Sequence, residues 1–277
     1  MAKTRVGSIS PLFYKKVAGH LPLIQDVSQR VGNVFYVDSG DGVDDTAHGT
    51  HPDSPFATID YGISRCTANQ GDVIFPLPGH VETINAAGAI DLDIAGISII
   101  GLGQGADRPT ITIGSSVDTS TVVVSAADCL LKNVILQPGN DGVDILLDIN
   151  ADGAIIEDVE LRSDEANAYQ ADTYIDINGG GANAADRVTL RRVKISSITA
   201  GATNGIEVGA VEDALVIEDC DIDGDFINAG IHSGSIFTNA MIRRNAVRNR
   251  QAGDHAIEFT AACTGFLIDN RLAGDTL

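Results

Sequence analysis

The chain has 277 residues, a formal net charge of −20, four cysteines and no tryptophan. A body this acidic is a poor partner for nucleic acid, because phosphate binding requires a basic face. No apolar run is long enough to cross a membrane or to form the core of a secretory signal, and the cysteines show no CxxC spacing, so neither a disulfide framework nor a zinc site is indicated.

The N-terminal residues differ in charge from the remainder. Residues 1–32 hold five basic side chains and one acid, a balance of +4 that leaves −24 for the rest of the chain. We expect residues 1–33 to form an arm that orders against a partner, and a frayed terminus is the simpler alternative. The expected partner-binding residues are Lys3, Arg5, Phe13, Tyr14, Lys15, Lys16 and Arg30.

Residues 34–70 are expected to form the beginning of the folded body, which spans residues 34–277. Residues 34–38 have the composition of a strand, and a loop rich in glycine and aspartate follows. Ser54 is a good N-cap with Pro55 at the first helical position, which predicts a helix that continues to about Thr67. Coils of strands then fill residues 71–277.

A short block of alternating apolar residues recurs from residue 129 onward. The first residues of successive blocks lie 25, 34, 27, 25 and 26 positions apart, and no block reaches helical length. A period in this range, in segments rich in β-branched residues, predicts a solenoid built from strands. The blocks begin at Leu131, Ile156, Leu190, Ile217, Ile242 and Ile268.

The second position of each block carries a charge, and its sign alternates along the chain. Parallel coils place equivalent residues roughly 4.8 Å apart, where opposite charges stabilise and like charges destabilise. The alternation therefore predicts a parallel stack in which these side chains form one column: Lys132, Glu157, Arg191, Glu218, Arg243 and Asp269.

The opening of the body resembles that of pectate-lyase-like right-handed parallel β-helix proteins, a group that includes bacteriophage tailspikes. The motifs that carry the resemblance lie between residues 34 and 84: Tyr36-Val37-Asp38, Ser54-Pro55-Phe56-Ala57-Thr58-Ile59, Gly71-Asp72-Val73-Ile74 and Pro78-Gly79-His80. The expected fold is a single-stranded right-handed parallel β-helix of about eight or nine coils with an N-terminal capping helix. The group contains lyases, hydrolases, isomerases and inert structural members, so the resemblance implies no single activity.

One outward column contains groups that could perform acid–base chemistry. Counted ten residues before each block, with an insertion of four allowed in one turn, the aligned positions are Thr121, Leu146, Asp176, Glu207, His232 and Glu258. Asp176 and Glu207 on adjacent coils would place carboxyls about 5 Å apart, near the separation in retaining glycosidases. The candidate catalytic residues are Asp176, Glu207, His232 and Glu258, and a solvated acidic face is the alternative.

No cofactor is indicated by a sequence motif. Pectate lyases bind calcium through acidic residues outside a coil, so the resemblance makes calcium possible. Its candidate ligands are Asp141, Asp144, Asp148 and Asp172, although no loop matches a defined calcium spacing.

Three functions fit these observations. The favoured one is a non-enzymatic structural protein of a virion or surface assembly, docked to a capsid or tail protein through the arm. We expect a homo-oligomer, with a trimer favoured, because no segment follows the last block to cover its open edge. The alternatives are a polysaccharide lyase or glycoside hydrolase that acts on a surface glycan, and an adhesin that binds a glycan without cleavage. The expected location is the virion, or else the cell surface or extracellular space, with no membrane insertion.

Overall fold

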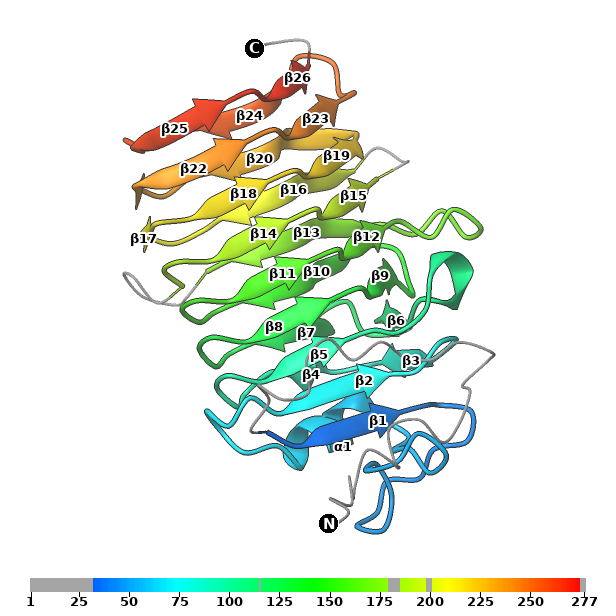
Figure 1. The fold of residues 1–277 in the computed structure, drawn as a ribbon. Helices are drawn as coiled ribbons and strands as arrows, with labels where there is room; N and C mark the ends of the chain where they lie inside the picture. Colours follow the sequence, from blue (N-terminus) through cyan, green and yellow to red (C-terminus); the bar gives the residue numbers. More distant parts are fainter. Residues whose placement is uncertain (1–31, 115, 179–184, 198–200, 275–277) are drawn as a thin grey trace, which may run out of the picture. The chain divides into compact units, whose positions relative to one another are not determined.

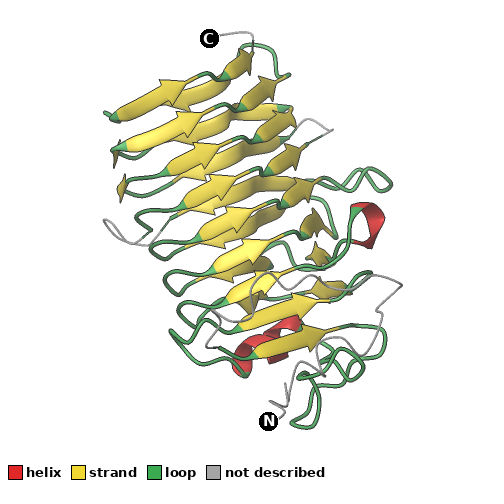
Figure 2. Cartoon of the chain, viewed as in Figure 1, coloured by secondary structure: helices red, strands yellow, loops and turns green. Residues whose placement is uncertain are grey.

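The computed structural model describes residues 32–114, 116–178, 185–197 and 201–274, and the structural statements below concern these residues. They form a parallel β-helix whose chain passes through three sheets in each turn (Figures 1 and 2). The smallest of these three sheets has seven strands, so seven turns are complete, and an eighth turn contributes two strands. The expected all-β solenoid is confirmed, with slightly fewer coils than the eight or nine expected.

The nine-stranded sheet forms one side of every turn and begins with the strand that precedes the helix. Its neighbouring strands all run parallel to one another. Its strands in spatial order are β1 (Val34–Val37), β2 (Val73–Pro76), β5 (Ser98–Ile100), β8 (Leu130–Lys132), β11 (Ile155–Glu157), β14 (Thr189–Arg191), β18 (Val216–Glu218), β22 (Ala240–Arg243) and β25 (Gly265–Ile268).

The eight-stranded sheet follows the nine-stranded sheet after a short bend in each turn. Its strands are β3 (Val81–Ile84), β6 (Thr110–Ile113), β9 (Ile135–Pro138), β12 (Glu160–Arg162), β15 (Lys194–Ser196), β19 (Asp221–Gly224), β23 (Ala246–Asn249) and β26 (Arg271–Ala273).

The seven-stranded sheet completes each turn and contains the longest strands. They are β4 (Ala87–Asp91), β7 (Thr121–Val124), β10 (Val143–Ile149), β13 (Ala171–Ile177), β16 (Ala202–Val208), β20 (Phe226–Ser233) and β24 (His255–Phe259). A two-stranded sheet of β17 (Glu212–Asp213) and β21 (Phe237–Thr238) lies in the connections that lead back to the nine-stranded sheet.

A short helix, α1 (Ile59–Ser64), lies at the N-terminal end and packs against β1, β2 and β4. The hydroxyl of Thr58 accepts a hydrogen bond from the backbone N–H of Tyr61 at 3.2 Å and so caps the helix. The buried Ile59 and Ile63 join the apolar interior. Within the described residues, the other helical segment is a 3₁₀ turn (η3, Gly105–Asp107), and no helix is long and apolar enough to cross a membrane.

The expected start of this helix at Ser54 is wrong. Ser54 forms an isolated β-bridge with His51, and Phe56 forms one with Val37. The carboxylate of Asp44 accepts hydrogen bonds from the backbone N–H groups of Ala57 and Thr58, at 2.7 and 3.1 Å. These bonds hold the segment extended up to Thr58, so the helix begins there instead.

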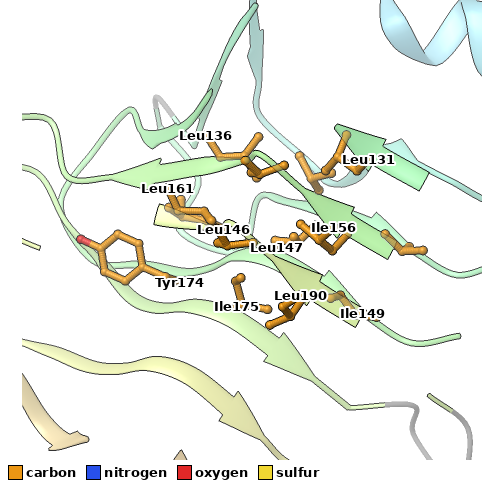
Figure 3. Packing of buried hydrophobic residues seen from close by; sticks show 14 of the residues in the cluster. Leu131, Leu136, Leu146, Leu147, Ile149, Ile156, Leu161, Tyr174, Ile175 and Leu190 are labelled. Carbon is orange, nitrogen blue, oxygen red and sulfur yellow. The ribbon is translucent and has the colours of Figure 1, made fainter. Parts of the chain in front are cut away.

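The inward side chains of all three sheets meet in one continuous apolar interior. Figure 3 shows part of it, in which Leu131, Ile156 and Leu190 come from the nine-stranded sheet and Leu147 and Ile175 from the seven-stranded sheet. Each of these side chains is almost completely buried. Burial of one such side chain contributes about 1.5–3 kcal/mol, and stacking of turns repeats that gain along the chain.

The alternating charges form the expected column on the nine-stranded sheet. Lys132 Nζ lies 2.6 Å from Glu157 Oε1, and Arg191 Nε lies 2.7 Å from Glu218 Oε1. Arg243 Nη2 lies 2.6 Å from the other oxygen of Glu218. The prediction that these five residues stack one above the other is confirmed by the strand register.

The predicted position of Asp269 in this column is wrong. Ile268, and not Asp269, pairs in register with Arg243. Asp269 instead occupies the bend that follows the strands of the nine-stranded sheet from β8 onward, where the backbone adopts a positive φ of 51–57°. This bend column contains Asn133, Asp158, Arg192, Asp219, Arg244 and Asp269.

The last turn ends in strands with an unpaired edge, because β24, β25 and β26 are each terminal in their sheets. Several apolar side chains of this turn are exposed: Phe266, Leu267, Ile268 and Leu272. That a subunit or another partner covers this edge stays a prediction, as does the boundary between the arm and the body after residue 33.

Candidate functional site

The four candidate catalytic residues stand side by side on the seven-stranded sheet. Asp176 on β13 pairs in register with Glu207 on β16, which pairs with His232 on β20, which pairs with Glu258 on β24. Adjacent parallel strands lie roughly 4.8 Å apart, so each side chain has its neighbour within reach. We call these four residues together with Asp148 the acidic ladder.

Asp148 is the member that the sequence alignment misplaced. It pairs in register with Asp176, and its other neighbour is Val123. Leu146 and Thr121, which the sequence alignment placed in this outward column, are buried. Two of the later connections from the seven-stranded to the nine-stranded sheet contain the short strands β17 and β21 and are therefore longer than the earlier connections. Counting back ten residues from every block consequently places the positions on β7 and β10 two residues too far toward the N-terminus.

A shared motif gives the correct alignment. The segments Leu147-Asp148-Ile149-Asn150 and Ile175-Asp176-Ile177-Asn178 both contain the sequence Asp-Ile-Asn. In both, the asparagine side chain hydrogen-bonds the aspartate; Asn150 Nδ2 donates to Asp148 Oδ2 at 2.7 Å. This repeated triplet is the signal that could have found Asp148 from the sequence.

Glu207 is held from two sides. Nδ1 of His232 lies 2.5 Å from Glu207 Oε2, and Nδ2 of Asn204 donates to the same oxygen at 2.7 Å. The other ring nitrogen of His232, Nε2, lies 4.0 Å from Glu258 Oε2. His232 therefore stands between the carboxylates of Glu207 and Glu258.

Asp176 lies in a different environment from Glu207. Its pKa is raised to about 7, chiefly by burial and then by the neighbouring Asp148 and Glu207 carboxylates, while the hydrogen bond from the Asn178 side chain opposes the shift. Its Oδ1 atom is buried without a hydrogen-bond partner. A carboxyl with this pKa is still partly protonated near neutral pH and can act as an acid.

Two glycines leave space beside these groups. A Cβ atom at Gly209 would lie 3.3 Å from Asp176 Oδ1, and one at Gly234 would lie 4.0 Å from Glu207 Oε1. The glycines lie two positions after Glu207 and His232, next along the same outward side of their strands. The ladder is thus not covered by side chains at these positions.

The seven-stranded sheet carries acids and no lysine or arginine on any of its strands. The side chains on these strands that contain a titratable nitrogen are His232 and His255. The pKa of Asp148 is raised by burial, with a contribution from Asp91, and that of Asp172 is raised by burial and then by Asp144. The acids on these strands are Asp91, Asp144, Asp148, Asp172, Asp176, Glu207 and Glu258.

The calcium candidates do not form one group. Asp148 belongs to the ladder, whereas Asp144 and Asp172 lie near the opposite ends of their strands. Within the described ranges, no three His, Cys, Asp or Glu side chains are placed to hold a metal ion. The candidate residues of the arm, from Lys3 to Arg30, lie outside the described residues, so their role stays a prediction.

The comparisons with known proteins agree with the fold. No protein-family model matches the chain, and no curated protein matches it. A solved structure described as rhamnogalacturonan lyase is similar, with a TM-score of 0.51 and 15% identity, over 82% of this chain and 73% of that one. A similarity at this level of identity shows a shared fold and does not show the tailspike branch. The chain therefore has a parallel β-helix fold, which it shares with this lyase structure.

Proposed function

We propose that the acidic ladder cleaves a glycan, with Asp176 and Glu207 as the two reacting carboxyl groups. The observation that carries the proposal is their pairing on adjacent strands in different environments. Asp176 has a pKa raised to about 7 by burial, and Glu207 accepts hydrogen bonds from His232 and Asn204. Glycosidases rely on two carboxyl groups whose surroundings separate their protonation states.

Protonated Asp176 would donate its proton to the glycosidic oxygen as the bond to the leaving sugar breaks. The Glu207 carboxylate, oriented by His232 and Asn204, would form the bond to the anomeric carbon. Water, deprotonated by the Asp176 carboxylate, would then release the sugar and restore both groups. Strands spaced roughly 4.8 Å apart match the separation of about 5–5.5 Å between the carboxyls of retaining enzymes.

The charge of this sheet favours hydrolysis of a neutral or amino-bearing glycan. A uronic-acid polymer would bring carboxylates to strands that carry acids and no lysine or arginine. Elimination from a uronate also needs its carboxylate neutralised, and none of these strands supplies a cation other than histidine. The polysaccharide-lyase alternative is compatible with the structural neighbour, but it would require an added cation here.

The test incubates the protein with neutral, amino-bearing and uronate polysaccharides and measures new reducing ends and unsaturated products. We expect reducing ends without unsaturation, and a loss of about 1,000-fold or more in Asp176→Asn and Glu207→Gln. Asp144→Asn, on the same sheet outside the ladder, is the matched control and should retain activity. Unsaturated products from a uronate would establish the lyase alternative. Binding without cleavage would favour the adhesin, and no cleavage of any glycan would contradict the proposal.

The structural role in a virion or surface assembly is a second candidate. The comparisons do not support it, and the feature that favours it is the unpaired last turn with its exposed Phe266 and Leu267. In this case residues 1–33 dock the protein to a capsid or tail protein. Deletion of residues 1–32 would abolish that association, and a truncated chain that still assembles would contradict it.

A further inference from the structure

The outward surface of the nine-stranded sheet carries an apolar column beside the ion pairs. In each strand from β5 to β25, one residue lies directly before the residue that pairs with Leu131 or its equivalents in the interior. These preceding residues pair in register from one strand to the next. Ile155 is 39% exposed and Phe266 is 64% exposed. From β8, the fourth strand, onward the column contains Leu130, Ile155, Thr189, Val216, Met241 and Phe266.

This sheet also differs from the rest of the body in charge. Its strands and the bends that follow them carry five basic and five acidic residues, which gives no net charge on a body whose balance is −24. The basic ones are Lys132, Arg191, Arg192, Arg243 and Arg244, and the acidic ones are Glu157, Asp158, Glu218, Asp219 and Asp269. The basic side chains from Lys132 to Arg244 each lie within 4.0 Å of a carboxylate of an adjacent turn.

The other two sheets are less suited to self-association. Two copies of the seven-stranded sheet would bring together seven acids from each copy without a lysine or arginine on their strands. The eight-stranded sheet is balanced in charge, but its outward positions are mainly polar, for example Thr112, Gln137 and Lys194. The nine-stranded sheet combines exposed apolar side chains with no net charge, so two copies of it could face each other without electrostatic repulsion.

We propose that the nine-stranded sheet is the surface through which two copies of this chain associate. The charge pattern selects a second copy as the occupant, because the mutual repulsion of two strongly acidic bodies is smallest where the facing surfaces are neutral. Nine strands at roughly 4.8 Å extend about 40 Å, which is long enough for the ~800 Å² that each partner buries in a stable interface. The proposal does not depend on the acidic ladder, which lies on a different sheet.

Sedimentation equilibrium of the full chain tests this surface. The test variant is Ile155→Lys, in the middle of the apolar column, and the matched control is Val81→Lys, at a 55% exposed valine on the eight-stranded sheet. Both substitutions change the charge equally. We expect the wild-type chain to be an oligomer whose dissociation constant rises about tenfold or more in Ile155→Lys and is unchanged in Val81→Lys.

Salt provides a second measurement. Added salt screens the repulsion between two acidic bodies, so association through a neutral apolar surface should strengthen as ionic strength rises. Circular dichroism establishes that both variants fold. A wild-type chain that stays monomeric, an Ile155→Lys variant that associates like wild type, or equal weakening in both variants would each overturn the proposal.

Discussion

Asp148 and Asp176 are paired in register on adjacent strands, and each has a raised pKa. Burial is the larger cause in both, and the Asp148 carboxylate is the first charged neighbour that raises the pKa of Asp176. The ladder thus continues past the reacting pair, and the residue beyond it affects how firmly Asp176 holds its proton.

Removal of that neighbouring charge should lower the pKa of Asp176. In Asp148→Asn we expect its titration, followed by the carboxyl ¹³C shift in NMR, to move below its present midpoint of about 7. Asp221→Asn, on the eight-stranded sheet, is the control and should leave the midpoint in place. If cleavage is detected, the alkaline limb of its pH profile should move in the same direction. An unchanged titration in Asp148→Asn would show that burial alone determines this pKa.

The protonated state of Asp176 also predicts how stability depends on pH. Its pKa in the folded protein, about 7, lies above the usual aspartate value of 3.8. The contribution to stability is therefore present in full below pH 3.8 and is lost as the pH rises toward about 7, at roughly 1.4 kcal/mol per pKa unit. Urea unfolding of Asp176→Asn should show a flatter dependence across this window than wild type does. Identical pH dependence in the two proteins would contradict the raised pKa.

His232 is predicted to act on the reaction through Glu207. Replacing it in His232→Gln removes the ring nitrogen that lies 2.5 Å from Glu207 Oε2, so cleavage should fall by about 100-fold while the strands remain paired. The measurement is the rate on the best glycan from the panel, together with a circular dichroism spectrum. His255→Gln, at the start of β24, is the matched control. Full activity in His232→Gln would remove this residue from the site.

Glu218 should be the most sensitive member of the ion-pair column. Its nearly buried carboxylate contacts Arg191, Arg243 and Arg244, and hydrogen bonds from Arg243 and then Arg191 hold its pKa below the usual range. We expect Glu218→Ala to lower Tm by roughly 2–8 °C, because three guanidinium groups lose a shared partner. The loss should shrink in acid, because the stabilisation is present above the unfolded pKa and disappears as the pH falls through the folded one. Glu165→Ala, in an exposed loop, should leave Tm unchanged.

The repeat made most of the fold predictable from the sequence. Lys132, Glu157 and Arg191 occupy equivalent places in blocks of constant form, so their stacking followed from the sign of each charge. Register was predictable wherever the block pattern was intact, and it failed by one residue at Asp269, where the pattern had decayed. The helix start failed because Asp44, ten residues before Ser54, binds backbone groups that no local propensity reveals.

The candidate site was predictable in part. Glu207, His232 and Glu258 lie on turns of similar length, and the insertion of four residues allowed in one turn brought Asp176 into line with them, so counting along the chain aligned all four correctly. Asp148 lies before a shorter connection and was displaced. The environment of each group was not accessible from spacing, because the burial of Asp176 and the contact of Asn204 with Glu207 depend on side-chain placement.

The absence of lysine and arginine from all strands of the seven-stranded sheet has an electrical consequence. Because the strand-borne cations are confined to the other two sheets, the centres of positive and negative charge on the strands are displaced from one another across the stack of turns. The strands therefore contribute a transverse electric dipole to the field of the body. This contribution favours the approach of a positively charged polymer to the seven-stranded sheet before any specific contact forms.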